Sequence, residues 1–341
     1  MRIITFAQAI RETIDGVMRK NNKVIVLGEG IDDSIGTWGT TLGLKESYGK
    51  ERVIDMPLAE NGATGIAIGA ALAGLIPIAV HQRIDFLLLA MDQIVNHAAK
   101  WSYMFGGKLS IPITIRCAVG MGWGMAGQHS QSLHALFTHI PGLKVVMPAT
   151  AYDAKGLLMS SIFDGNPVIF IENYLLYKMT GHVPKSQYSI PLGKGIIRKR
   201  GRDATLVTFS IALHRSLEAA EILSREGIDL EIIDLRSLCP LDEGLIFASV
   251  KKTGRLVIVE PAVLTCGFGA EISARVNERL FAQLKSPVIR IAFPDSPAPA
   301  SSALEKFYYP DARAIVKTIR RVFDGTGKYK TLSHIPLAKI A

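Results

Sequence analysis

The segment from Asp55 to Gly62 contains the residue best suited to acid–base chemistry. It reads DMPLAENG and places Glu60 after a β-branched run and at the start of a stretch of small residues. Ligands of open α/β sheets bind beyond the carboxyl ends of strands, where this carboxylate is expected. Apolar neighbours would desolvate it and raise its pKa, so that it could share or donate a proton. Alternatively, Glu60 only complements the dipole of a following helix.

A second candidate follows a glycine-rich loop. Residues 120–132 read GMGWGMAGQHSQS, so His129 is expected where the loop meets a helix capped near Ser130. A neutral imidazole at such a junction can exchange protons near pH 7, although an ordinary loop histidine fits the pattern as well. Glu60 and His129 together would also permit a hydrolase or a lyase.

Other common catalytic patterns are missing from the sequence. It contains no GxxxxGK[ST] phosphate loop and no GxSxG nucleophile elbow, and its 8 histidines show no metal-ligand spacing. The 3 cysteines lie far apart, which is typical of reduced thiols in the cytoplasm. The residues alone therefore indicate an enzyme with an acid–base site at strand ends.

Alternating strands and helices are expected to position these residues. Short apolar runs separated by segments of helical period predict an α/β fold with largely parallel sheets, covered by helices on both faces. The expected strands are 24–28, 52–55, 77–81, 111–116, 144–147, 167–171, 204–209, 229–234, 255–260 and 287–292. The expected helices are 5–20, 61–74, 90–104, 130–138, 151–163, 212–226, 243–252, 268–283 and 311–323.

The length of 341 residues predicts two domains. Glycine, proline and basic residues interrupt the alternation at 186–203, which we interpret as a linker between domains at 1–185 and 204–325. Residues 326–341 are expected to form a basic tail.

Charge and hydropathy argue against nucleic-acid and membrane binding. The net charge of +9 is spread along the chain, whereas a nucleic-acid surface needs a basic face or stripe. Residues 62–80 are uncharged, but Gly74 and Pro77 divide them, so a buried small-residue helix and a core strand are expected there. The N-terminus becomes charged too soon for a secretory signal, which favours the cytoplasm.

Long motifs lie in register over residues 3–324, and they include ERVIDMPLAENG, DFLLLAMDQIVNHAAK, GQHSQSLHALFTHIPGLKVVMPAT, NPVIFIEN and GFGAEI. Together they resemble the β subunit of the thiamine-diphosphate-dependent 2-oxoacid dehydrogenase E1 component, of the pyruvate and branched-chain types. The resemblance implies a transketolase-like pyrimidine-binding domain followed by a transketolase C-terminal domain. It also implies decarboxylation of a 2-oxoacid such as pyruvate, with transfer of the acyl group to lipoyl-E2.

The resemblance assigns roles to three residues. Glu60 matches the glutamate that hydrogen-bonds N1′ of the cofactor's aminopyrimidine, and Phe86 matches the aromatic residue that packs on that ring. His129 matches the histidine that faces the substrate and the incoming lipoyl group. The cofactor would supply the difficult chemistry.

One motif of the family is missing. Its members bind diphosphate and Mg²⁺ through Gly-Asp-Gly and a later Asn, but this chain contains no GDG. In E1 enzymes that motif belongs to the α subunit, so the resemblance implies an active site shared within an α2β2 heterotetramer. The GxxxG spacing of Gly65 and Gly69 would allow close helix packing, either at such an interface or within the domain.

Some members of the family also hold a potassium ion, largely through backbone oxygens. The matching positions here are Ile113, Ser161, Asp164 and Asn166. Carbonyl and carboxylate oxygens suit such a hard cation.

The stretch before Phe86 departs from the family pattern. Residues 81–85 read HQRID, where typical members carry mostly apolar or aromatic residues. We interpret Gln82 as a cofactor contact and Arg83 as a positive group near the substrate, favouring a more acidic or sugar-like 2-oxoacid. The alternative for Arg83 is a salt bridge with Asp85 behind the site. These departures leave open a split transketolase-like or acyl-transferring enzyme of a specialised pathway, and less readily a scaffold without activity.

Overall fold

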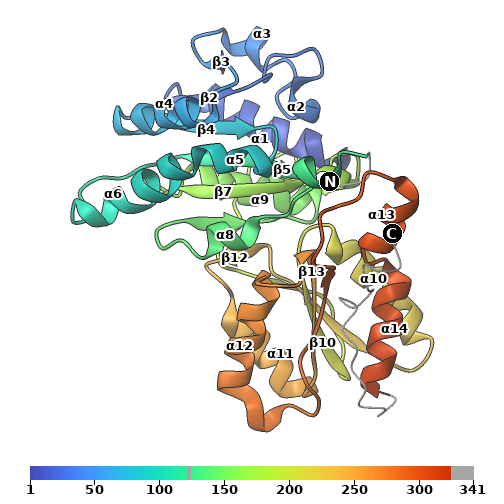
Figure 1. Ribbon diagram of the computed structural model, residues 1–341. Coiled ribbons are helices and arrows are strands. Elements are labelled where there is room, and N and C mark those ends of the chain that lie inside the picture. Colours follow the sequence, from blue (N-terminus) through green and yellow to red (C-terminus); the bar gives the residue numbers. More distant parts are fainter. Residues whose placement is uncertain (121–123, 324–341) are drawn as a thin grey trace. The chain divides into compact units, whose positions relative to one another are not determined.

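The computed structural model describes residues 1–120 and 124–323 of the chain (Figure 1). Residues 121–123 of the glycine-rich loop and the expected tail at 326–341 lie outside the described residues. The chain divides into two compact units, and neither is one continuous stretch. The first comprises 1–120, 136–193 and 237–240; the described part of the second comprises 124–135, 194–236 and 241–323. The four-segment division expected from the sequence therefore stays a prediction.

Seven strands form the main sheet of the first unit. They are β2 (Val24–Gly28), β3 (Val53–Asp55), β4 (Ile76–His81), β5 (Thr114–Val119), β6 (Lys144–Val146), β7 (Val168–Asn173) and β12 (Ser237–Cys239). Their order is β12-β6-β7-β5-β4-β2-β3, and all neighbouring pairs are parallel except β12 with β6. Two further strands, β1 (Arg2–Thr5) and β8 (Thr180–Val183), form a separate antiparallel pair.

Helices connect these strands. They are α1 (Phe6–Lys20), α2 (Gly36–Gly39), α3 (Leu44–Tyr48), α4 (Glu60–Leu72), α5 (Ile84–Leu87), α6 (Ala99–Met104), α8 (His134–Thr138) and α9 (Ala151–Ile162). Shorter turns are η1 (Leu88–Ala90), η2 (Gln93–Ala98) and η3 (Tyr174–Leu176). Every residue of β2, β5 and β7 is buried, which explains why these strands read as continuous apolar runs.

Helix α1 shows how local sequence sets one boundary. The Thr5 hydroxyl accepts a hydrogen bond from the backbone N–H of Gln8, and the Gln8 side chain accepts one from the N–H of Thr5. This capping box satisfies two backbone donors that the helix itself cannot. The apolar stripe that includes Ile10 and Ile14 is buried, and α1 packs against α9.

The second unit contains a five-stranded sheet. Its strands are β9 (Ile196–Lys199), β10 (Ala204–Thr208), β11 (Leu230–Asp234), β13 (Leu256–Val263) and β14 (Ile289–Phe293). They lie in the order β14-β13-β10-β11-β9, with only β9 antiparallel to its neighbour. The helices and turns are α7 (Ala126–His129), α10 (Ala212–Ser224), α11 (Glu243–Thr253), α12 (Phe268–Leu280), η4 (Phe281–Gln283), α13 (Ser302–Tyr308) and α14 (Ala312–Phe323).

The α/β fold class and the alternation of elements are confirmed, with three corrections. The helix expected over 130–138 begins only at His134, and residues 126–129 form the separate helix α7. The stretch expected as one helix over 90–104 includes a π-helical segment, η2. Strand β9 lies inside the segment interpreted as a linker, because it pairs with β11 and so completes the second sheet.

Helix α4 differs most from expectation. It was expected to be a buried small-residue helix, but Ile66 is 57% exposed and Leu72 is 39% exposed. Helix α4 packs on β4, η1 and η2, and Ala67 and Ile68 are buried there, whereas Ile66 and Leu72 are not covered by the described residues.

Among the described residues, no helix combines the length and apolar character needed to cross a bilayer.

Candidate functional site

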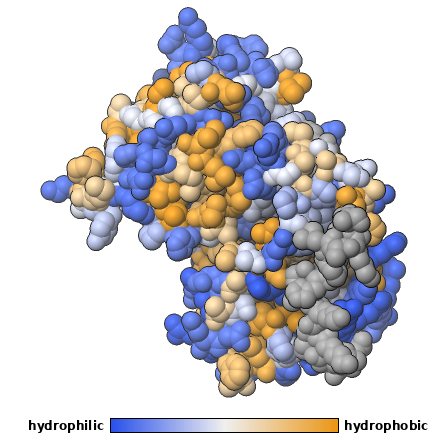
Figure 2. All heavy atoms as spheres, in the orientation of Figure 1, coloured by the Kyte–Doolittle hydropathy of each residue, from blue (hydrophilic) through white to orange (hydrophobic). Residues whose placement is uncertain are grey.

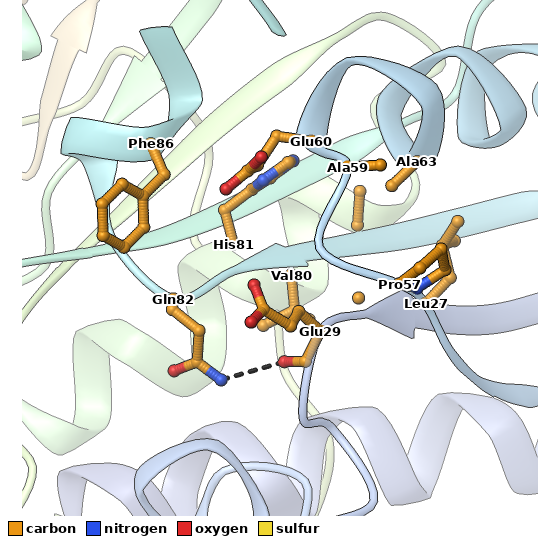
Figure 3. A pocket seen from close by; sticks show the side chains of 12 residues that line it. Leu27, Glu29, Pro57, Ala59, Glu60, Ala63, Val80, His81, Gln82 and Phe86 are labelled. Carbon is orange, nitrogen blue, oxygen red and sulfur yellow. Dashed lines mark hydrogen bonds between the residues drawn. The ribbon is translucent and has the colours of Figure 1, made fainter. Parts of the chain in front are cut away.

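A pocket lies at the carboxyl ends of β2, β3 and β4 (Figure 3). These strands are neighbours in the sheet, with β2 between the other two, so the segments that follow them meet at one edge. The pocket is a hollow that opens to solvent. Its polar lining residues are Glu29, Glu60, His81 and Gln82.

Glu60 reaches this pocket from the first turn of α4. Strand β3 ends at Asp55, whose carboxylate accepts a hydrogen bond of 2.8 Å from the N–H of Gly30. The chain then turns through Pro57 and Ala59, which also line the pocket, before α4 begins at Glu60. A carboxylate at a helix N-terminus is stabilised by the helix dipole. Glu60 thus lies at a strand-to-helix junction, as predicted from the sequence.

The floor of the pocket depends on a close approach of two backbones. A β-carbon added to Gly28, at the end of β2, would lie 2.2 Å from the carbonyl oxygen of Val80 in β4. No side chain fits in that space, so glycine is required here. The close contact sets the distance between the segments carrying Glu29 and His81.

Glu29 is a functional candidate that the sequence analysis missed. Burial raises the pKa of its carboxyl group, and the nearby negative charges of Glu60, Asp55 and Asp33 raise it further. Its backbone carbonyl accepts a 2.9 Å hydrogen bond from the Gln82 side chain, which fixes the turn after β2 against the end of β4 (Figure 3). The signal available in the sequence was an acid directly after a buried strand.

Phe86 completes the wall of the pocket. It lies in α5, directly after the β4 segment, and its ring is half-buried with one side toward the pocket. The structure thus brings together Glu60, Gln82 and Phe86, three of the residues singled out in the sequence. An acid, an amide and an aromatic ring in one hollow suit a flat heterocycle with hydrogen-bonding edges.

His129 belongs to the second unit. It is the last residue of α7 and is half-buried. The helix begins at Ala126, whose φ of 54° places its backbone in the left-handed region. His129 thus lies at the end of a short helix rather than at the start of one, and its catalytic role stays a prediction.

Arg83 is not among the residues that line the pocket. Its side chain is only 4% exposed, beside Asp85, which is 7% exposed. Burial lowers the pKa of Arg83, whereas the negative charge of Asp85 opposes that shift. This environment favours the alternative role, a buried charge balanced by Asp85.

We expect Arg83→Ala to lower the free energy of unfolding by about 3 kcal/mol, because it leaves Asp85 buried without its countercharge. Preference among 2-oxoacids should not change in the active assembly. Chemical denaturation and competition between pyruvate and a dicarboxylic 2-oxoacid would measure the two effects. Arg19→Ala, on an exposed part of α1, is the matched control. A stable variant with altered preference would restore the substrate-binding role.

The residues considered for potassium are already partly engaged in other hydrogen bonds. Both oxygens of the Asp164 carboxylate accept hydrogen bonds from Lys144, at 2.7 and 2.6 Å. The carbonyl of Ile113 accepts from Val168, and that of Ser161 accepts from Asp164. In the described part of the chain, no group of three or more His, Cys, Asp or Glu side chains could hold a metal ion.

Comparison with known proteins places this chain in a family. The family model described as the transketolase pyrimidine-binding domain matches residues 2–179, and that of the transketolase C-terminal domain matches residues 193–315. The β subunit of acetoin:2,6-dichlorophenolindophenol oxidoreductase from Cupriavidus necator is 46% identical over 96% of this chain and 99% of its own length. The pyruvate dehydrogenase E1 component subunit β from Rhizobium meliloti is 44% identical over 94% of this chain and 70% of its own.

The chain belongs to the 2-oxoacid dehydrogenase E1 β-subunit family, with transketolase-type domains. A solved structure described as a split-gene transketolase, an inactive β4 tetramer, has the same fold. It superposes with a TM-score of 0.78 at 24% identity and covers 94% of this chain and 98% of its own. The resemblance found in the motifs and the transketolase-like fold are both confirmed.

Membership explains the arrangement of the pocket. The domain matched over residues 2–179 is named for pyrimidine binding, and it contains all the residues that line the pocket at β2, β3 and β4. Thiamine diphosphate, the cofactor that the family implies, carries an aminopyrimidine ring. The pocket is therefore the natural candidate for that ring in this E1 β-subunit relative.

Proposed function

We propose that this chain is the β subunit of a thiamine-diphosphate-dependent E1 component that decarboxylates a 2-oxoacid and passes the acyl group to lipoyl-E2. The observation that carries the proposal is the meeting of Glu60, Glu29 and Phe86 in one pocket at the ends of adjacent parallel strands. The same enzyme class is supported by relatives that span almost the whole chain.

The pocket residues fit the aminopyrimidine end of the cofactor. Glu60 would hold a proton at a ring nitrogen, Phe86 would pack on the ring face, and Gln82 would fix the adjacent turn through its bond to Glu29. Glu29 lies beside Glu60 in this pocket, where burial and the charge of Glu60 raise the pKa of its carboxyl group. When bound, the cofactor supplies the electron sink that decarboxylation requires. His129 would exchange a proton with the substrate or the acyl acceptor.

The other end of the cofactor calls for a second polypeptide. This chain has no GDG motif, and its described residues offer no cluster of metal-binding side chains. We therefore assign the diphosphate and Mg²⁺ to an α subunit, in an α2β2 heterotetramer. Potassium stays a secondary proposal, and it would rely on the carbonyls near Ile113, Ser161 and Asn166 because Lys144 engages the Asp164 carboxylate.

An exposed apolar surface near the pocket supports such an assembly. Helix α4 packs against η1 and η2, and these elements expose Ile66, Leu72, Leu88 and Leu89. Figure 2 shows apolar side chains over the part of the first unit where Figure 1 labels α5, the helix directly before η1. A β-carbon at Gly69 would meet no atom of the described residues within 4 Å, whereas one at Gly65 would contact Gln93 of the same unit. Gly69 thus suits an intersubunit contact and Gly65 an internal one.

We expect the chain alone to show no turnover and the chain with its α subunit to decarboxylate 2-oxoacids. The experiment is co-expression with a chain that carries GDG and a later Asn, followed by assays with pyruvate and branched-chain 2-oxoacids. Reductive acylation of a lipoyl domain would identify the acceptor. Full activity without a partner would contradict the proposal.

Acetoin is a second candidate substrate, because β subunits of acetoin oxidoreductases from two bacteria are 46% and 44% identical to this chain. Including acetoin in the same assays, with 2,6-dichlorophenolindophenol as electron acceptor, would distinguish the two activities. Activity on sugar phosphates without acylation of a lipoyl domain would instead favour a split transketolase-like enzyme. Failure of the assembled protein to bind thiamine diphosphate would favour a scaffold.

A further inference from the structure

His81 is a pocket residue to which the proposed function assigns no role. It is the last residue of β4 and lines the pocket that contains Glu60 and Glu29 (Figure 3). Its side chain is only 6% exposed. An imidazole buried to this extent must either find hydrogen-bond partners or lower the stability of the fold.

The partner of His81 is Thr64. The Nε2 atom of His81 lies 3.1 Å from the hydroxyl oxygen of Thr64, which is fully buried in α4. Thr64 follows Glu60 by four residues, so the two side chains lie on the same face of the helix. The contact therefore joins the end of β4 to α4 one turn beyond the acid.

Two other buried helical threonines bond differently. In α1 and α14, the hydroxyls of Thr13 and Thr318 donate to the carbonyl oxygens four residues earlier, those of Ala9 and Ala314. Within the described residues, the hydroxyl of Thr64 has its bond to His81 in place of a bond to its own helix. The Thr64 side chain thus links α4 to His81 of β4 and not to the preceding turn of its own helix.

An acceptor Nε2 requires a neutral ring with its proton on Nδ1. Burial lowers the pKa of His81 to about 4, so the ring is neutral near pH 7 and can share a hydrogen bond with the Thr64 hydroxyl. A positively charged imidazolium in this pocket would attract the carboxylates of Glu60 and Glu29 and so compete with a bound ligand for them. The neutral ring leaves both carboxylates free to act on a bound ligand.

We propose that His81 and Thr64 form a positioning pair that fixes the first turns of α4 on the end of β4 and so sets the place of Glu60. The inference rests on the proposed function, because it concerns how the acid is aligned for the reaction. Neither residue needs to touch the substrate. Since a misplacement of about 1 Å can cost about a hundredfold in rate, one buried bond at this position has a measurable effect.

The test uses the enzyme assembled with its α subunit. Thr64→Val and His81→Phe should each lower kcat about tenfold, with KM and the affinity for thiamine diphosphate unchanged. The double variant should be no slower than the slower single variant, because both changes remove the same bond. Thr64→Ser, which keeps the hydroxyl, should retain the rate.

Thr13→Val is the matched control, since Thr13 is also a fully buried helical threonine of the first unit but does not line the pocket. It should leave kcat unchanged. The inference is overturned if Thr64→Val keeps full kcat, if Thr13→Val loses as much, or if the losses in the double variant multiply. Wild-type enzyme that binds no thiamine diphosphate would instead contradict the proposed function itself.

Discussion

Replacing Glu60 with glutamine is expected to lower kcat of the assembled enzyme by about 10²–10⁴-fold, the range for losing a group that transfers a proton in the transition state. Glutamine keeps the size and the hydrogen-bonding edge of the side chain, but it cannot give up or take up a proton at that position. The fold and the assembly should persist, because Glu60 is half-buried at a helix N-terminus and not in the core.

Steady-state assays on the heterotetramer would measure this loss. Glu46→Gln is the control, since Glu46 lies in the first turn of α3 and makes the same helix-dipole interaction away from the pocket. A Glu60→Gln enzyme with unchanged kcat would leave the carboxylate with only its helix-dipole role. Equal losses in both variants would point to helix stability and not to chemistry.

The second large effect is expected on stability. Glu172, in β7, accepts hydrogen bonds from Nε and Nη2 of Arg116, in β5, at 2.6 and 2.9 Å. Both side chains are almost fully buried, and the hydroxyl of Tyr177 donates a third bond to Glu172 at 2.8 Å. Burial raises the pKa of Tyr177 well above its ordinary value, so this hydroxyl keeps its proton.

Glu172→Gln should therefore destabilise the first unit by about 3–5 kcal/mol, because it leaves the Arg116 guanidinium buried without a countercharge. Urea unfolding followed by circular dichroism would report the change as a lower midpoint. The double variant Arg116→Met with Glu172→Leu should recover most of the loss, since a buried ion pair can be replaced by apolar residues at little cost. A Glu172→Gln variant as stable as the wild type would show that water reaches Arg116.

Local information in the sequence was sufficient for most of the secondary structure. Strands such as β2 and β7 read as apolar runs because helices cover both faces of the sheet, and the capping box at Thr5 marks where α1 begins. Glu60 could be identified because the strand before it and the small residues after it are consecutive in the chain. The family motifs then added roles that spacing alone leaves open.

Only the tertiary structure decided which segments share the pocket. The strand order puts β2 between β3 and β4, so Glu29, Glu60 and His81 meet although they are separated by tens of residues in the sequence. The same packing buried the side chain of Arg83 and left Ile66 and Leu72 of α4 exposed. Strand order and burial depend on contacts between distant parts of the chain, and hydrophobic periodicity reports only which residues avoid water, not which surface covers them.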